Sequence, residues 1–117
     1  MKAVYKYPGE HAEVIDINND LTTLQHLVEG YIEIVRETVR VQATGESFEY
    51  VLILNEEGKL WGLEENIFPA NQTGDVYVGP VVCVGRDGVE FTDIPDEWAQ
   101  LLRVFLDLRS VEVGGRV

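Results

Sequence analysis

The stretch "FEYVLIL", residues 48–54, contains the most apolar run of the chain, with Val51, Leu52, Ile53 and Leu54 in succession. Side chains of a strand alternate between the two faces of a sheet, so a strand that is apolar at every position is expected to be covered on both faces. We therefore place this strand in the middle of a sheet. The segments on either side of it predict the rest of the fold.

Three upstream stretches have the composition of strands. Residues 2–8, "KAVYKYP", alternate in polarity and end at the turn residues Pro8-Gly9, and residues 12–17, "AEVIDI", predict a return strand that completes a hairpin. Residues 31–42, "YIEIVRETVRVQ", are rich in β-branched residues, but their apolar positions change parity midway. A bulge or tight bend near residues 36–38 would reconcile the two halves.

The sequence "NEEGK", residues 55–59, follows the central strand directly, and the apolar pattern resumes at Leu60 and Trp61. Two strands joined by about three to five residues that include a glycine are typical of a β-hairpin with a bulged loop. Gly58 is the residue expected to take the positive φ of that loop. The two adjacent glutamates of the turn point in divergent directions, so we interpret them as turn acids rather than as a catalytic pair.

The part of the chain after this turn is less regular. Residues 64–75, "EENIFPANQTGD", have no clear period and predict a loop, with a helical turn at residues 64–67. Residues 76–84 return to the pattern of a strand, which Gly79-Pro80 interrupts, so that an edge or a bulge is expected there. Residues 89–91 predict one more brief strand.

Two segments change to a helical period. Residues 18–30 carry apolar residues at spacings of three and four, between the capping candidates Asn18, Asn19 and Asp20 and the closing Gly30. Residues 92–109, "TDIPDEWAQLLRVFLDLR", predict a second amphipathic helix, with Arg109 at its C-terminal end. Its apolar stripe is expected to pack on the sheet, with a partner subunit as the alternative.

The tail, residues 110–117, is expected to add a strand or to fray. Together the segments predict one α+β domain over residues 1–117, with a mainly antiparallel sheet and two helices packed on one of its faces.

Acidic residues dominate the composition, with 21 Asp and Glu against 9 Lys and Arg and a net charge of −12. Direct binding to nucleic acid or to an anionic membrane depends on Lys and Arg neutralising phosphates, so this balance disfavours both. No stretch approaches the roughly 18 apolar residues of a membrane span, and the first residues are too polar for a signal peptide. We therefore expect a cytoplasmic protein.

The inventory of reactive side chains is small. The lone cysteine, Cys83, lies in the strand pattern "VVCVG" and is expected to be a buried, inert thiol. His11 and His26 have no second histidine or cysteine at ligand spacing, so no metal site is expected. Phosphate-binding loops, nucleophile elbows and zinc-protease motifs are absent from the sequence. On this inventory we expect neither a cofactor nor an enzymatic activity.

Four segments in this order resemble the family called domain of unknown function 3846. They are "GYIEIV" at 30–35, "LILNEEGKLWGL" at 52–63, "GDVYVGPVVCVG" at 74–85 and "DEWAQLL" at 96–102. The resemblance spans nearly the whole chain and implies an origin in bacteriophages, plasmids and other mobile elements, without implying an activity. The chain departs from the family pattern after "GL", where a proline and then Asn-Arg are usual, because Asn66 is kept but Ile67 takes the place of the arginine.

Three functions remain as hypotheses. The first is a phage or mobile-element accessory protein that binds a host or phage protein through loop 62–75, with a homodimer as one form of it. The second is an acidic mimic of nucleic acid that inhibits a host defence or restriction protein, for which −12 is the right sign. The third is a small-ligand, nucleotide-like binding protein with a pocket beneath loop 62–75, for which Trp61, Tyr77 and Asn66 are the candidates for stacking and hydrogen bonding.

Overall fold

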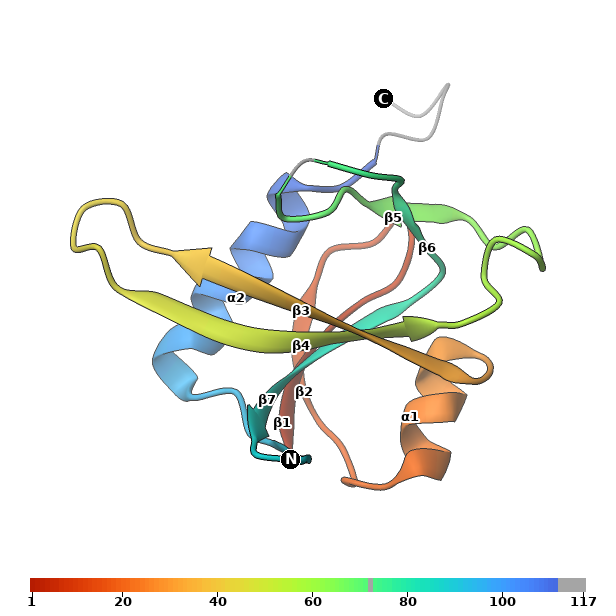
Figure 1. Cartoon of the computed structure of the whole chain (residues 1–117), viewed down its shortest axis with the longest axis horizontal. Coiled ribbons are helices and arrows are strands. Elements are labelled where there is room, and N and C mark those ends of the chain that lie inside the picture. The colour runs from red at the N-terminus through yellow and green to blue at the C-terminus, as the bar shows by residue number, and fades with distance from the viewer. Residues whose placement is uncertain (72, 112–117) are drawn as a thin grey trace.

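The computed structural model describes residues 1–71 and 73–111. Its main element is a 6-stranded antiparallel sheet with the strand order β2-β1-β7-β4-β3, in which β8 pairs with β7 (Figure 1). These strands are β1 (Lys2–Lys6), β2 (Glu13–Asp16), β3 (Ile32–Arg40), β4 (Ser47–Asn55), β7 (Val81–Asp87) and β8 (Glu90–Thr92). The short strands β5 (Glu65–Ile67) and β6 (Tyr77–Val78) form a separate pair, and the helices are α1 (Leu21–Val28) and α2 (Asp96–Leu108).

Strand β4 is an interior strand, as its apolar run predicts. It lies between β7 and β3, and every residue from Tyr50 to Asn55 is buried. Leu52 and Leu54 belong to the core cluster that packs against α2, whereas Val51 and Ile53 belong to the cluster that packs against α1. Both faces of the strand are therefore covered.

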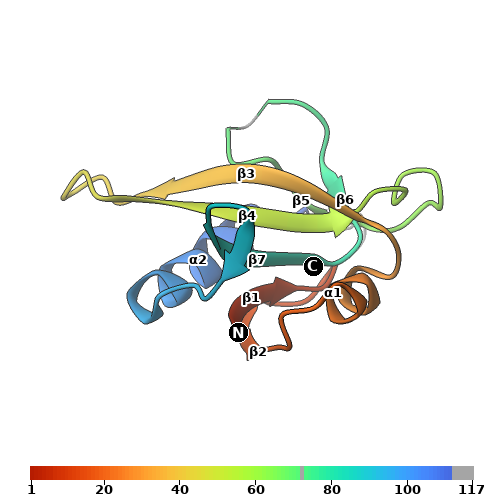
Figure 2. The same ribbon diagram turned by 60° about the horizontal axis from the view of Figure 1, so that its bottom comes forward.

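The α+β class and the mainly antiparallel sheet are confirmed, but the expectation that both helices pack on one face is wrong. Side chains of opposite parity on β4 contact different helices, so α1 and α2 lie on opposite faces of the sheet. Figure 2 shows the two helices at opposite ends of the molecule. Because β4 and β7 are apolar at successive positions, each face can bury a helix, and the helical patterns themselves do not say which face each helix takes.

The strands at the two ends of the sheet show one prediction confirmed and one wrong. β1 and β2 form the expected hairpin, with Lys2 opposite Asp16. β3 pairs with β4 in one unbroken register from Ile32 opposite Asn55 to Arg40 opposite Ser47, so the expected bulge near residues 36–38 does not form. The change of parity has a different origin, because Ile32 packs against the cluster around α1, Ile34 is exposed, and Val35 and Val39 pack in the cluster around α2.

The segment after β4 departs furthest from expectation. Residues 56–62 form turns, and no strand resumes at Leu60 and Trp61, so the predicted hairpin is wrong. Residues 65–67 form strand β5 instead of a helical turn. Gly79-Pro80 interrupts the strand pattern as predicted, between β6 and β7, but β7 is an interior strand and not the edge that was one of the two expectations there. The brief strand expected near residues 89–91 is confirmed as β8.

The helix ends and the single thiol follow the sequence closely. The Asp20 side chain caps α1 by accepting a hydrogen bond from the Thr23 amide at 2.7 Å, although Glu29, and not Gly30, takes the left-handed conformation at the other end. Cys83 is buried as predicted, and burial raises the pKa of its thiol. Neither helix of the described residues is long and apolar enough to cross a membrane.

Of the tail, residues 110–117, the structure describes only residues 110 and 111. Ser110 forms an isolated antiparallel bridge with Ile67, and the rest of the prediction for the tail, at residues 112–117, lies outside the described residues.

Candidate functional site

The turn formed by residues 56–62, called here the 56–62 turn, is held to the sheet by Asn55. The Asn55 side-chain oxygen accepts a hydrogen bond from the Glu57 amide at 2.8 Å, and its side-chain nitrogen donates to the Val28 carbonyl of α1 at 3.0 Å. Within the turn, the Trp61 amide donates to the Glu57 carbonyl at 3.0 Å and the Leu63 amide to the Gly58 carbonyl at 3.0 Å. The turn is therefore an ordered structure anchored on a buried side chain.

Two glycines shape this turn for different reasons. Gly58 does not have the positive φ that the sequence predicts, but a Cβ at this position would lie 2.8 Å from Cγ2 of Val78. Gly62 is the residue in the left-handed region, with a φ of 69°. Gly58 is thus required by the close approach of β6, and Gly62 by the backbone conformation.

Three large apolar side chains are exposed on or beside the 56–62 turn. Leu60 is 78% exposed, Trp61 is 70% exposed and Tyr31 is 65% exposed. Tyr31 lies next to the turn because its carbonyl accepts a hydrogen bond from the Glu56 amide at 2.8 Å. The turn projects from one end of the sheet (Figure 1), so these side chains are accessible to another molecule. We call these three residues the apolar tip.

A hollow of about 390 Å³ opens beside the apolar tip, and its charged lining is mainly acidic. Its lining includes the carboxylates of Glu33, Glu56, Glu57 and Asp75 and the ammonium group of Lys59. Lys59 donates to Asp75 at 2.8 Å, and this contact lowers the pKa of the Asp75 carboxyl group. The surroundings of the apolar tip therefore carry a net negative charge.

The structure separates the three residues that the sequence predicts as a site. Trp61 is exposed on the turn, Asn66 is buried in β5, and Tyr77 is half-buried in β6. Tyr77 lines the hollow beside the apolar tip, whereas Trp61 and Asn66 do not. Burial and the negative charge of Glu37 raise the pKa of Tyr77 to about 12, so its hydroxyl group is a hydrogen-bond donor at neutral pH.

Asn66 uses its side chain to join three parts of the fold. Its amide nitrogen donates to the Lys6 carbonyl at 2.9 Å and to the Gly79 carbonyl at 2.8 Å, and its oxygen accepts from the Lys6 ammonium group at 3.0 Å. Lys6 is itself buried, which lowers its pKa. Both amide hydrogens of the Asn66 side chain are used in these hydrogen bonds, so the side chain has no donor left for a ligand. Asn66 therefore has a structural role.

A buried ion pair between Glu37 and Arg109 lies behind Tyr77. The guanidinium group of Arg109 donates to Glu37 at 2.9 Å and to the Tyr50 hydroxyl at 3.2 Å, and that hydroxyl donates to Glu37 at 2.6 Å. The Ala70 amide also donates to Glu37 at 3.1 Å. This network connects β3, β4 and the loop after β5 to the end of α2.

Sequence reasoning missed this network, although one signal of it was present. Glu37 has the same parity on β3 as Val35 and Val39, which face the core, so alternation alone places its carboxylate on the buried side. Arg109 has no comparable signal. It directly follows the last residue of α2, and a basic residue at the C-terminal end of a helix is common on the protein surface, so its position does not predict burial.

The described residues do not contain a cluster of three or more His, Cys, Asp and Glu side chains that could hold a metal ion. The family model of DUF3846, a domain of unknown function, matches residues 1–106. The chain belongs to the DUF3846 family. No curated protein and no solved structure matches it. The match to DUF3846 includes the whole apolar tip and Glu37, and it ends before Arg109.

Proposed function

We propose that this DUF3846 protein acts by binding another protein through its apolar tip, as an accessory protein of a phage or other mobile element. The observation that carries the proposal is the exposure of Leu60 and Trp61, at 78% and 70%, on an ordered turn. Trp and Tyr contribute strongly to binding at protein interfaces, because they bury large areas while losing little conformational freedom. The apolar tip has this composition, with Leu60 and Trp61 on the turn and Tyr31 beside its first residue.

The anchoring of the turn supports the same function. Asn55 ties the 56–62 turn to α1 and to its own backbone, so the tip is presented in one conformation before a partner arrives. Preorganisation reduces the entropy that binding costs. A loosely attached loop with the same residues would bind less tightly.

The charges around the tip favour a particular kind of partner. Glu56 and Glu57 lie on the turn itself, and Glu33 and Asp75 line the neighbouring hollow. Complementary potentials steer association and disfavour wrong partners. The partner surface that fits is an apolar pocket surrounded by Lys and Arg.

The mobile-element role is the part of the proposal that rests on family resemblance. The four segments that resemble DUF3846 carry it, and the family match over residues 1–106 supports the family itself. A small acidic protein that binds a basic host or phage surface is consistent with such a role.

The two other hypotheses have weaker support. The body measures 37 × 34 × 23 Å, which is broad rather than elongated, whereas a duplex mimic needs carboxylates in rows along an extended face. A nucleotide pocket built from Trp61, Tyr77 and Asn66 lacks support because these side chains do not line one hollow.

The test compares the wild type with Leu60→Ala/Trp61→Ala and with Leu108→Ala as a matched control. Leu108 is 80% exposed on α2, so its truncation removes an equally exposed leucine far from the tip. Each tagged chain is used as bait in a bacterial lysate, and captured proteins are then purified and titrated against the three chains. We expect a protein that the wild type and Leu108→Ala bind equally, and that the double variant binds at least about 30-fold more weakly.

Trp61 emission provides a second, direct readout. Binding in an apolar pocket shifts the emission of an exposed indole to shorter wavelength, and Trp61→Phe should remove this shift. A partner that binds the double variant as tightly as the wild type would contradict the proposal, as would an unchanged Trp61 emission in the complex.

A further inference from the structure

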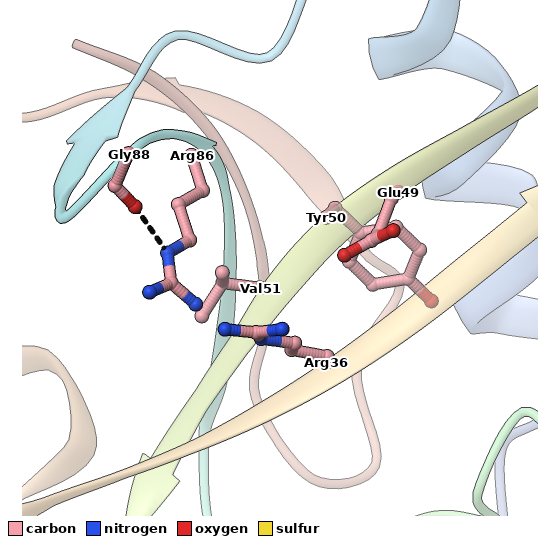
Figure 3. A pocket seen from close by; sticks show the side chains of 6 residues that line it. All are labelled: Arg36, Glu49, Tyr50, Val51, Arg86 and Gly88. Atoms are coloured by element: carbon pink, nitrogen blue, oxygen red, sulfur yellow. Dashed lines mark hydrogen bonds between the residues drawn. The ribbon is translucent and has the colours of Figure 1, made fainter.

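A second hollow, of about 400 Å³, lies over strands β3, β4 and β7, away from the apolar tip. It is lined by Arg36, Glu49, Tyr50, Val51, Arg86 and Gly88 (Figure 3). Arg36 lies directly opposite Val51 in the sheet, and Val51 lies opposite Val84, two residues before Arg86. Arg36, Val51 and Arg86 therefore share the face of the sheet on which α1 packs.

The two arginines in this hollow are arranged in an unusual way for so acidic a protein. Figure 3 shows their side chains pointing toward one another across Val51. Both residues are exposed, and no carboxylate of residues 1–71 and 73–111 forms a salt bridge with either of them. The chain has 9 basic residues against 21 acidic ones, so carboxylates are abundant, yet within the described residues even Glu49, which lines the same hollow, forms no salt bridge with either arginine.

One of the arginines is also held in place. Nε of Arg86 donates to the Gly88 carbonyl at 2.6 Å, which orients the guanidinium group and leaves its terminal nitrogens to another acceptor. Two guanidinium groups that face each other repel, and an anion between them removes this repulsion. The arrangement therefore favours a bound anion over an empty hollow.

We propose that this hollow binds a small phosphomonoester, with its phosphate group between Arg36 and Arg86. The planar guanidinium fork matches the oxygens of a phosphate group, and a doubly charged phosphate interacts with two such forks more strongly than a carboxylate does. The hollow is larger than a phosphate group alone, and its volume lies in the range of small-ligand sites.

Glu49 narrows the class of ligand. Its carboxylate lines the same hollow, and it accepts hydrogen bonds but repels a second phosphate group. The ligand that fits is a monophosphate whose remainder carries hydroxyl groups toward Glu49, such as a sugar phosphate or a nucleoside monophosphate. This inference is independent of the protein-binding function proposed above, because no residue of the apolar tip lines the hollow.

The test uses isothermal titration of the full chain with inorganic phosphate, ribose 5-phosphate, adenosine monophosphate and adenosine. The variants are Arg36→Gln and Arg86→Gln, with Arg103→Gln on α2 as the control that removes the same charge elsewhere. We expect at least one of the two phosphomonoesters to bind more tightly than phosphate, adenosine not to bind, and each hollow variant to weaken binding by about tenfold or more. Arg103→Gln should bind as the wild type does.

Glu49→Gln tests whether the part of the ligand beyond the phosphate group contacts Glu49. This variant should weaken the binding of the phosphomonoester that the wild type prefers and leave the binding of inorganic phosphate equal or stronger. Equal affinity for phosphate and both phosphomonoesters would overturn the proposal, as would an equal loss in Arg103→Gln or the absence of saturable binding below about 1 mM. Arg36, Glu49 and Arg86 are exposed and Arg103 is half-buried, so thermal unfolding of each variant serves to confirm an intact fold.

Discussion

Glu37 and Arg109 are the only oppositely charged side chains of the described residues that form a salt bridge with both partners buried. Their hydrogen bonds are nearly complete, because Glu37 also accepts from Tyr50 and Ala70, and Nε of Arg109 donates to the Phe68 carbonyl at 2.8 Å. The guanidinium carbon lies 4.8 Å from the centre of the Phe105 ring. Buried pairs stabilise little compared with apolar residues of the same volume, but breaking one partner leaves a charge without compensation.

Glu37→Gln should lower the free energy of unfolding by about 3–5 kcal/mol, because Arg109 would remain buried without its carboxylate. Glu33→Gln is the matched control, since Glu33 lies on the same strand with an exposed side chain, and we expect a change below about 0.5 kcal/mol. Urea unfolding followed by circular dichroism measures both. Losses of equal size in the two variants would show that the ion pair is not important for stability.

At the scale of elements, the pattern of polar and apolar residues predicted the features that depend on residues close together in the sequence. The β1–β2 hairpin and the interior position of β4 follow from a few adjacent residues each, and both are confirmed. The faces that α1 and α2 occupy depend on contacts between distant segments, so the sequence pattern did not predict them. The same holds for Asn66, whose partners Lys6 and Gly79 are close only in the folded chain.

The 56–62 turn was mispredicted for a different reason. Leu60 and Trp61 resemble the start of a strand because they are apolar, yet both face solvent. Local rules of folding fail most often where residues serve function rather than stability. The turn that carries the apolar tip is therefore both the place where the predicted fold was wrong and the candidate site. For Arg36 and Arg86, no pattern in the sequence predicts that they lie close together.

Gly58→Ala tests how the turn packs against β6. The added Cβ would lie 2.8 Å from Cγ2 of Val78, so we expect a loss of about 1–3 kcal/mol in the free energy of unfolding. Val78→Ala removes the obstructing methyl group, and the double variant should lose less than the sum of the two single variants, by about 1 kcal/mol. The three variants are compared by urea unfolding. Strict additivity would mean that the close approach is not what requires glycine here.

At the scale of the whole molecule, charge is the dominant property. A net charge of −12 is confined to a body of 37 × 34 × 23 Å, so the carboxylates repel one another on average. Four of the salt bridges in the described part of the chain involve exposed groups, which solvent and salt screen, so they contribute little to the stability of the fold. Repulsion among the remaining acids therefore opposes folding.

Sodium chloride should consequently stabilise this protein. Salt screens the repulsion among the excess acids and also weakens the few exposed salt bridges, and the first effect is larger because acids outnumber bases by 21 to 9. Between about 0.05 and 0.5 M salt we expect the midpoint of thermal unfolding to rise by about 4–8 °C, equivalent to about 1 kcal/mol. Glu10→Lys/Glu46→Lys, at two exposed positions outside helices and strands, reduces the excess of negative charge and should show a higher midpoint at low salt and a smaller rise. If salt lowered the midpoint of the wild type, or raised both proteins equally, specific ion pairs rather than net charge would control the stability of the fold.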